Sequence, residues 1–134
     1  MNEAFINAYF IRVDAETPYK GYMGQIENSF TALKSCIGGR ITTYDFTEDI
    51  VMVAEEDAVI LGRRLNRALF DSNGERIAVF AGNLLFVRHE EDRFTSLQDG
   101  DVALIEEHFK PIERIFGGEV YLKPADELPE WGYE

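Results

Sequence analysis

The chain has 134 residues, of which 46% are hydrophobic and 13% aromatic, and its formal net charge at pH 7 is −12. This length fits one domain, and the apolar content excludes an intrinsically disordered chain. The single cysteine excludes an internal disulfide and a cysteine-based zinc site, and two histidines are too few for most histidine-built sites, so the sequence predicts neither a metal nor a cofactor.

The N-terminus lacks a basic segment followed by a long apolar run, which argues against a signal peptide. No stretch reaches the ~20 consecutive apolar residues that a membrane span requires. We therefore expect a soluble, cytoplasmic protein. Its single domain is expected to cover residues 1–124, and residues 125–134 are expected to form an acidic, loosely held tail.

The negative charge is concentrated towards the C-terminus. Residues 1–88 contain 12 acidic and 9 basic residues, whereas residues 89–134 contain 13 acidic and 4 basic residues. Such a field repels nucleic acid and anionic membrane surfaces and attracts basic protein surfaces. The charge therefore excludes direct binding to nucleic acid and is compatible with nucleic-acid mimicry.

Three strands are predicted in the first half of the chain. Residues 4–13 are rich in β-branched and aromatic residues and end in a turn-forming run. Residues 40–46 and 49–57 follow with the apolar alternation of strands, and residues 58–62 either continue or restart that sheet.

A short helix is predicted within residues 26–40, between the first two of these strands. Asn28 or Ser29 caps its N-terminus, and the Gly38-Gly39 pair ends it. Its apolar face contains Phe30, Leu33 and Ile37. Cys36 sits beside that face, where a buried and unreactive thiol is expected.

The second half of the chain starts with a segment, residues 61–70, that we interpret as a turn of helix or an irregular crossing over the sheet. Asn73-Gly74 then predicts a tight hairpin turn, because both residues tolerate positive φ. Residues 76–82 and 83–89 are predicted strands, and the Gly82-Asn83 pair between them marks a second tight turn.

A second helix is predicted after this sheet. Thr95, Ser96 or Asp99 caps its start, and Pro111 stops it. A short closing strand follows at residues 119–124. The elements together predict an α+β fold, with a mostly antiparallel β-sheet of about five strands and two short helices packed on it.

No catalytic constellation is evident, so we expect a protein that is not an enzyme. His89 lies in an acidic run expected to be a solvated loop, and His108 lies late in the second helix, where a protonated imidazole complements the helix dipole. The acidic runs 54–57 and 90–92 are contiguous and on presumed turns, which does not separate the pKa values of an acid and a base.

One basic cluster interrupts the acidic chain, and it is our candidate anion site: Arg63, Arg64, Asn66 and Arg67. Arginine is the side chain best suited to bidentate contact with phosphate or carboxylate. Alternatively, Arg67 pairs with a nearby acid or carbonyl and helps Asn66 to organise the backbone, while Arg63 and Arg64 are solvated. Three aromatic residues, each also a candidate for the core, could stack on a nucleotide base: Tyr44, Phe46 and Phe70.

Two segments resemble an uncharacterised bacterial and phage family, domain of unknown function 3846. They are "IENSFTALKSCIGGRI" and "ILGRRLNRALFDSNGERIAVFAGNLLFV", and the late "F-x-S-L" pattern matches Phe94, Ser96 and Leu97. The resemblance covers most of residues 25–109. The family's "L-N-R-A-L" element falls on Leu65, Asn66, Arg67, Ala68 and Leu69.

This resemblance implies an α+β domain of a kind common in phages, integrative elements and plasmids, and it implies no reaction and no ligand. Small acidic proteins on such elements often counter host defences, which is an association and not a property of the fold.

Three hypotheses about function follow. In the first, the protein is an inhibitor that docks an acidic face, with Glu106, Glu107 and Glu113, onto a basic host protein that binds nucleic acid. In the second, it is a sponge for a nucleotide signal that uses the arginine cluster. In the third, it is a regulatory interaction domain with no role in defence. Oligomeric state stays open, with a homodimer as one option.

Overall fold

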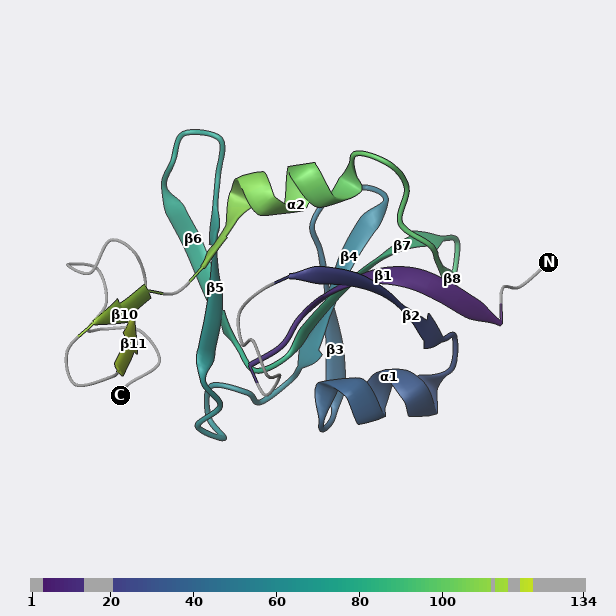
Figure 1. Ribbon diagram of the computed structural model, residues 1–134, viewed down its shortest axis with the longest axis horizontal. Coiled ribbons are helices and arrows are strands. Elements are labelled where there is room, and N and C mark those ends of the chain that lie inside the picture. Colours follow the sequence, from purple (N-terminus) through teal and green to yellow (C-terminus); the bar gives the residue numbers. More distant parts are fainter. Residues whose placement is uncertain (1–3, 14–20, 112, 116–118, 122–134) are drawn as a thin grey trace.

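The computed structural model describes residues 4–13, 21–111, 113–115 and 119–121 (Figure 1). The first half of the chain contains β1 (Phe5–Ile11), β2 (Tyr22–Glu27), α1 (Phe30–Ile37), β3 (Ile41–Asp45) and β4 (Ile50–Glu55). The second half contains β5 (Leu65–Phe70), β6 (Arg76–Ala81), β7 (Leu84–Glu90), β8 (Arg93–Thr95), α2 (Asp101–His108), β9 (Phe109–Pro111), β10 (Glu113–Ile115) and β11 (Glu119–Tyr121).

The predicted α+β class is confirmed, and the strands are divided between sheets. Within the described residues, the main sheet has the order β2-β1-β7-β4-β3, with β8 paired to β7. A second sheet has the order β6-β5-β9, and β10 pairs with β11. The pairings in all three sheets are antiparallel.

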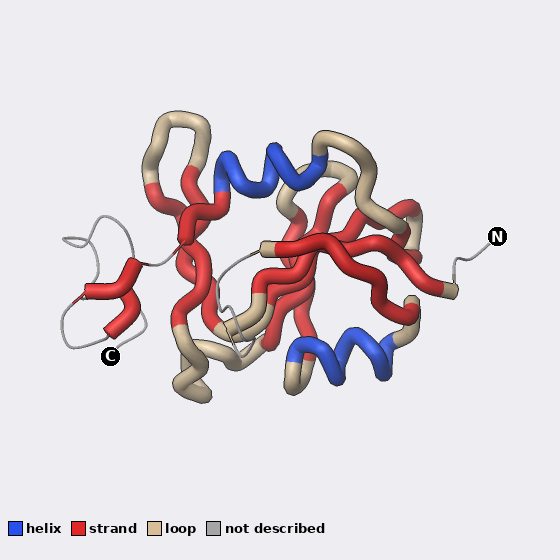
Figure 2. The backbone as a smooth tube through the Cα atoms, viewed as in Figure 1, coloured by secondary structure: helices blue, strands red, loops and turns tan. Residues whose placement is uncertain are grey.

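The two helices cover opposite faces of the main sheet (Figures 1 and 2). One core, beneath α2, contains Ile105 and Phe109 together with side chains of β1, β4 and β7. The other core, beneath α1, contains Leu33 and Ile37 with the opposite side chains of the same strands. All six residues of β4 are buried, as expected for a strand covered on both faces.

The helix predicted within residues 26–40 is confirmed as α1, and its ends have the expected chemistry. Ser29 Oγ accepts a hydrogen bond of 3.1 Å from Ala32 N. Gly38 has φ 99°, a left-handed conformation that glycine adopts without steric cost, and its N–H donates to Lys34 O. Neither helix among the described residues is long and apolar enough to cross a membrane.

The second predicted helix exists, but both its predicted ends were wrong. Thr95 belongs to β8, and Ser96 Oγ accepts a hydrogen bond of 2.9 Å from Asn7 N, so both residues are held on the main sheet. The N-cap is Gly100, which supplies no side-chain bond. Pro111 does not stop the helix, because the chain leaves α2 at Phe109 and pairs with β5 as β9.

Three further expectations about elements require correction. Residues 61–70 were expected to form a turn of helix or an irregular crossing, but Leu65–Phe70 is a strand, β5, between β6 and β9, with register shifts towards β6. Residues 58–62 form turns and not a strand. The strand Tyr22–Glu27 was not predicted; it extends the main sheet by pairing along β1.

The two predicted glycine turns are present, but they join strands in different ways. At Asn73-Gly74, Gly74 has φ 84° and the turn closes the β5–β6 hairpin. At Gly82-Asn83, Gly82 has φ 78°, and the chain passes from β6 in the second sheet to β7 in the main sheet. The short closing strand is present as β11, and the predicted tail, residues 125–134, lies outside the described residues.

Candidate functional site

Asn66 joins the two sheets. It is fully buried, and its Nδ2 donates to Ile11 O at 2.9 Å and to Gly82 O at 2.7 Å. Ile11 ends β1 in the main sheet, whereas Gly82 follows β6 in the second sheet. The β5–β6 register shifts between Leu65 and Arg67, so Asn66 is the extra residue of a bulge. The expected role of this amide in bonding backbone carbonyls is confirmed.

Arg67 is buried within the fold, with only 3% of its side chain exposed. Its Nη2 lies 3.9 Å from Glu106 Oε2, and its Nε and Nη1 have no hydrogen-bond partner among the described residues. Burial lowers the pKa of Arg67 to about 10, so the guanidinium remains charged at neutral pH. The expected pairing of Arg67 with an acid is present only as this 3.9 Å contact with Glu106.

Arg63 forms an ion pair with Glu55, which corrects the alternative that it is only solvated. Its Nε and Nη2 donate to the two carboxylate oxygens of Glu55, at 2.7 and 3.0 Å. Glu55 is buried in β4, which corrects the expectation that residues 54–57 form a solvated turn. The hydrogen bond that Arg63 donates to Glu55 is the main reason that the pKa of Arg63 is raised.

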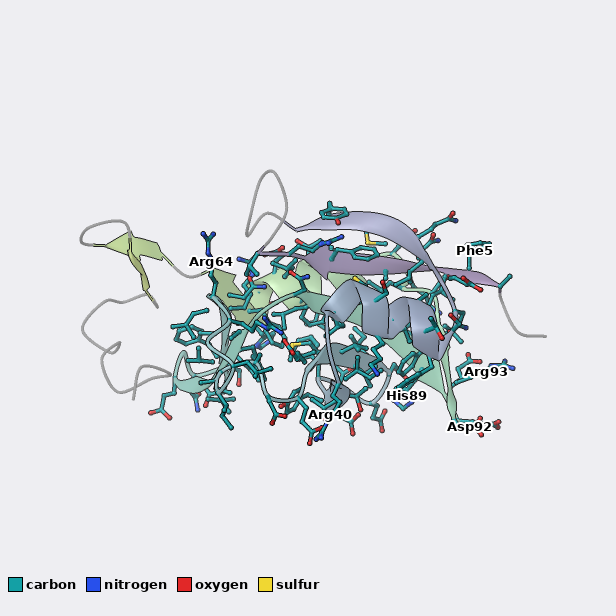
Figure 3. The ribbon with its side chains drawn as sticks, turned by 90° about the horizontal axis from the view of Figure 1, so that it is seen from below. Phe5, Arg40, Arg64, His89, Asp92 and Arg93 are labelled. Atoms are coloured by element: carbon teal, nitrogen blue, oxygen red, sulfur yellow. The ribbon has the colours of Figure 1, made fainter. Side chains whose placement is uncertain are left out.

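Arg64 is exposed and forms no ion pair with the part of the chain that the structure describes. It points away from the body of the molecule (Figure 3). Together with Arg63 and Glu55 it lines a cleft of about 540 Å³ between the C-terminal end of α1 and the Gly82-Asn83 turn. The carbonyl end of a helix disfavours anions, and Glu55 cancels one of the two arginine charges.

The predicted arginine cluster is thus split between two environments. Arg63 and Arg64 line the cleft, whereas Asn66 and Arg67 are buried and do not line it. Strand geometry is the cause, because residues 65–70 pass between two other strands and carry Arg67 towards α2. These four residues do not form one phosphate pocket.

The predicted acidic face, with Glu106, Glu107 and Glu113, is also divided. Glu107 is exposed, while Glu106 is half-buried and faces Arg67. Glu113 lies in β10, but its side chain lies outside what the structure describes.

A different acidic surface is formed by the fold, which we term the acidic end. It combines the β3–β4 turn with the β7–β8 turn, because β4 pairs with β7 and His89 N donates to Asp49 O at 2.9 Å. Its exposed carboxylates are Asp45, Glu48, Asp49, Glu90, Glu91 and Asp92. Sequence reasoning missed it because the two acidic runs are about forty residues apart and meet only through strand pairing.

Two arginines lie at the acidic end and offset part of its charge. Arg88 is bound by the buried carboxylate of Asp101, at 2.7 Å, and reaches Asp49 only at 3.7 Å. Arg93 lies 3.6 Å from Glu90. Figure 3 shows Asp92 and Arg93 projecting into solvent at the end of the molecule opposite Arg64.

The remaining candidate side chains have structural contacts. Tyr44 is 43% exposed and its ring packs on Phe80, while Phe46 packs against the core and against the His108 ring. His108 Nδ1 donates to Phe70 O at 3.0 Å, since a carbonyl can only accept. His89 lies in β7 and not in a loop. Cys36 is only half-buried and lines the cleft.

Fold and site together define an α+β domain in which buried Asn66 joins two sheets, buried Arg67 lies next to it in β5, and one end is strongly acidic. The chain belongs to the family described as domain of unknown function (DUF3846), whose model matches residues 6–110. The match spans β1 to β9 and includes Asn66 and Arg67. No curated protein and no solved structure matches the chain significantly.

Proposed function

We propose that this protein is a non-enzymatic binding protein that presents its acidic end to a basic, nucleic-acid-binding partner and blocks it. The observation that carries the proposal is the acidic end itself: six exposed carboxylates from two turns, with only two arginines among them, one of which is held by Asp101. Carboxylates repeated across a surface attract the same basic grooves that bind phosphates.

The partner in this proposal is a host defence protein, and the source is a phage or another mobile genetic element. The resemblance of the chain to a family of a kind common on such elements supports this setting. The nucleotide sponge receives less support, because Arg63 is paired with Glu55 and Arg67 does not line the cleft. With such a partner, the protein would act in the host cytoplasm, as an inhibitor by protein binding.

The test is an affinity capture with tagged protein at low and high salt, followed by competition with nucleic acid. The test variant combines Glu90→Gln, Glu91→Gln and Asp92→Asn. A control variant removes the same charge elsewhere by Glu27→Gln, Glu75→Gln and Glu107→Gln.

We expect the wild type and the control to retain a nucleic-acid-binding protein at low salt, and to lose it to high salt or to added nucleic acid. The test variant should not retain it. Equal capture by the test variant, or a partner that added nucleic acid does not displace, would contradict the proposal.

A further inference from the structure

The second sheet ends on β6, and the outer edge of this strand is open to pairing. Among the described strands β6 pairs with β5 alone, so its other edge presents backbone N–H and C=O groups that no strand bonds. Ile77–Ala81 contains no charged residue and no proline, which are the residues that usually keep another strand from adding to an edge. The other end strands of the two larger sheets do contain such residues: Glu27 in β2, Asp45 in β3 and Pro111 in β9.

A groove runs along this edge of β6. It has a volume of about 350 Å³ and is lined by four consecutive residues of the strand, Ala78–Ala81. Successive side chains of a strand point to opposite faces, so a hollow that meets each residue in turn lies against the edge of the strand and not over one face. On its other side the groove is lined by Tyr44 of β3, whose ring centroid lies 5.2 Å from that of Phe80. The groove therefore lies between the end strands of two sheets.

Exposed apolar side chains border the groove. Val59 is 42% exposed, Ile60 85% and Tyr44 43%, and all three line it. Val59 and Ile60 belong to the turns between β4 and β5, where Leu61 N donates to Asp57 O at 2.8 Å. Covering apolar side chains that a turn already holds in place is favourable, because it removes their surface from water.

The charged residues that line the groove are all acidic: Glu55, Glu56 and Asp57. Glu55 binds Arg63, and Glu56 accepts a hydrogen bond of 2.7 Å from Arg40. Asp57 forms no ion pair with the part of the chain that the structure describes, and only its longer-range field reaches Arg40. A basic residue of a partner would complete this set. A second copy of the chain would bring the same acids and another net charge of −12, so charge disfavours it.

We propose that the edge of β6 is a docking site for an extended segment of another protein, which adds a strand to the second sheet. The segment carries apolar side chains at alternate positions, which enter the groove, and a lysine or arginine that pairs with Asp57. Main-chain hydrogen bonds to Ala78–Ala81 give affinity, and the groove selects the side chains. None of the six carboxylates of the acidic end lines the groove, so this docking site does not rest on the proposed function.

The test measures the binding of synthetic peptides to the full chain by fluorescence anisotropy. The parent peptide alternates valine with threonine and has a lysine at each end, and a second peptide has glutamate in place of lysine. Two further peptides carry N-methyl groups on alternate residues of the parent, one for each phase of the alternation. We expect the parent to bind and the glutamate version to bind more weakly. Only one methylated peptide should bind, because an added strand bonds the edge through every second residue.

Variants of the protein locate the bound peptide. The test variant combines Val59→Ser with Ile60→Ser, and Leu61→Ser is its control, because Leu61 is 55% exposed in the same turns but does not line the groove. The test variant should weaken binding of the parent peptide by about tenfold or more, since it removes apolar contacts. Asp57→Asn should weaken binding by about threefold, and Leu61→Ser should leave it unchanged. Amide hydrogen exchange within Ala78–Ala81 should slow in the complex.

The proposal is overturned if the parent peptide does not bind at concentrations up to about 1 mM. It is also overturned if both methylated peptides bind as well as the parent, or if Leu61→Ser weakens binding as much as the test variant does. Binding that depends only on Glu90, Glu91 and Asp92 would place the lysines at the acidic end, which overturns this proposal and leaves the proposed function standing. A homodimer that the test variant separates would assign the edge to a second copy and would overturn the assignment to another protein.

Discussion

Arg88 and Asp101 form a two-point ion pair that fastens the beginning of α2 to the main sheet. Arg88 Nε lies 2.7 Å from Asp101 Oδ2, and Nη2 lies 3.0 Å from Oδ1. The same carboxylate accepts a hydrogen bond of 2.8 Å from Gln98 N. Because the N-cap residue Gly100 has no side chain to bond the first turn, Asp101 provides the negative group at this helix end.

Replacing Asp101 by asparagine should lower the free energy of unfolding by about 2–3 kcal/mol, because a nearly buried charge-assisted pair is broken. Urea unfolding measures the change. Asp99→Asn is the matched control, since Asp99 is exposed two residues earlier, and it should change the stability by less than about 0.5 kcal/mol. Equal effects of the two substitutions would show that the ion pair contributes nothing specific.

The same pair should make stability depend on pH in the acid range. The hydrogen bond from Arg88 is the main cause that lowers the pKa of Asp101 below its ordinary value of 3.8. A carboxylate with a depressed folded-state pKa stabilises the fold above its unfolded-state pKa, and this stability is lost as pH falls through the folded-state pKa. The stability difference between wild type and Asp101→Asn should therefore be constant near neutrality and shrink below about pH 4. A difference that persists unchanged at the lowest pH at which both proteins fold would contradict this.

Removing the amide of Asn66 should destabilise the protein by roughly 3 kcal/mol, because two buried carbonyls, Ile11 O and Gly82 O, lose their donor. Asn66→Ala is compared with Asn73→Ala by thermal unfolding, since Asn73 lies exposed in the β5–β6 turn. A loss of similar size in Asn73→Ala would argue against a special role for the Asn66 bonds.

Phe109 connects the second sheet, α2 and the main sheet through its ring. It is 2% exposed, and its ring centroid lies 4.9 Å from that of Phe86 and 5.1 Å from that of Phe46. Phe109→Ala should lower the free energy of unfolding by about 3–5 kcal/mol, since it removes the ring and leaves a cavity. Phe30→Ala provides the control, because Phe30 is 64% exposed on α1. Measured by urea unfolding, the loss of unfolding free energy should be several-fold larger for Phe109→Ala than for Phe30→Ala. Similar losses in the two variants would contradict the central position of Phe109.

Features that depend on neighbouring residues were predictable from the amino-acid sequence. The helix α1 follows from the Ser29 cap, the spacing of Leu33 and Ile37, and a glycine that accepts positive φ. The Asn73-Gly74 turn follows from the same conformational preference. The class of fold and the family also follow from patterns that run along the chain.

The candidate sites could not be predicted from the sequence, because they depend on the tertiary structure. Arg63, Arg64 and Arg67 are neighbours in sequence, yet one pairs with Glu55, one faces solvent and one is buried near Glu106. The acidic end depends on the pairing of β4 with β7, which brings together residues that are distant along the chain.

The sequence by itself therefore determined the α+β class, α1, the tight turns and the overall negative charge, because local backbone preferences and composition carry that information. Only the tertiary structure decided which charges are exposed, paired or buried. Strand register and the division of strands between two sheets set those distances, and neither is encoded by adjacent residues.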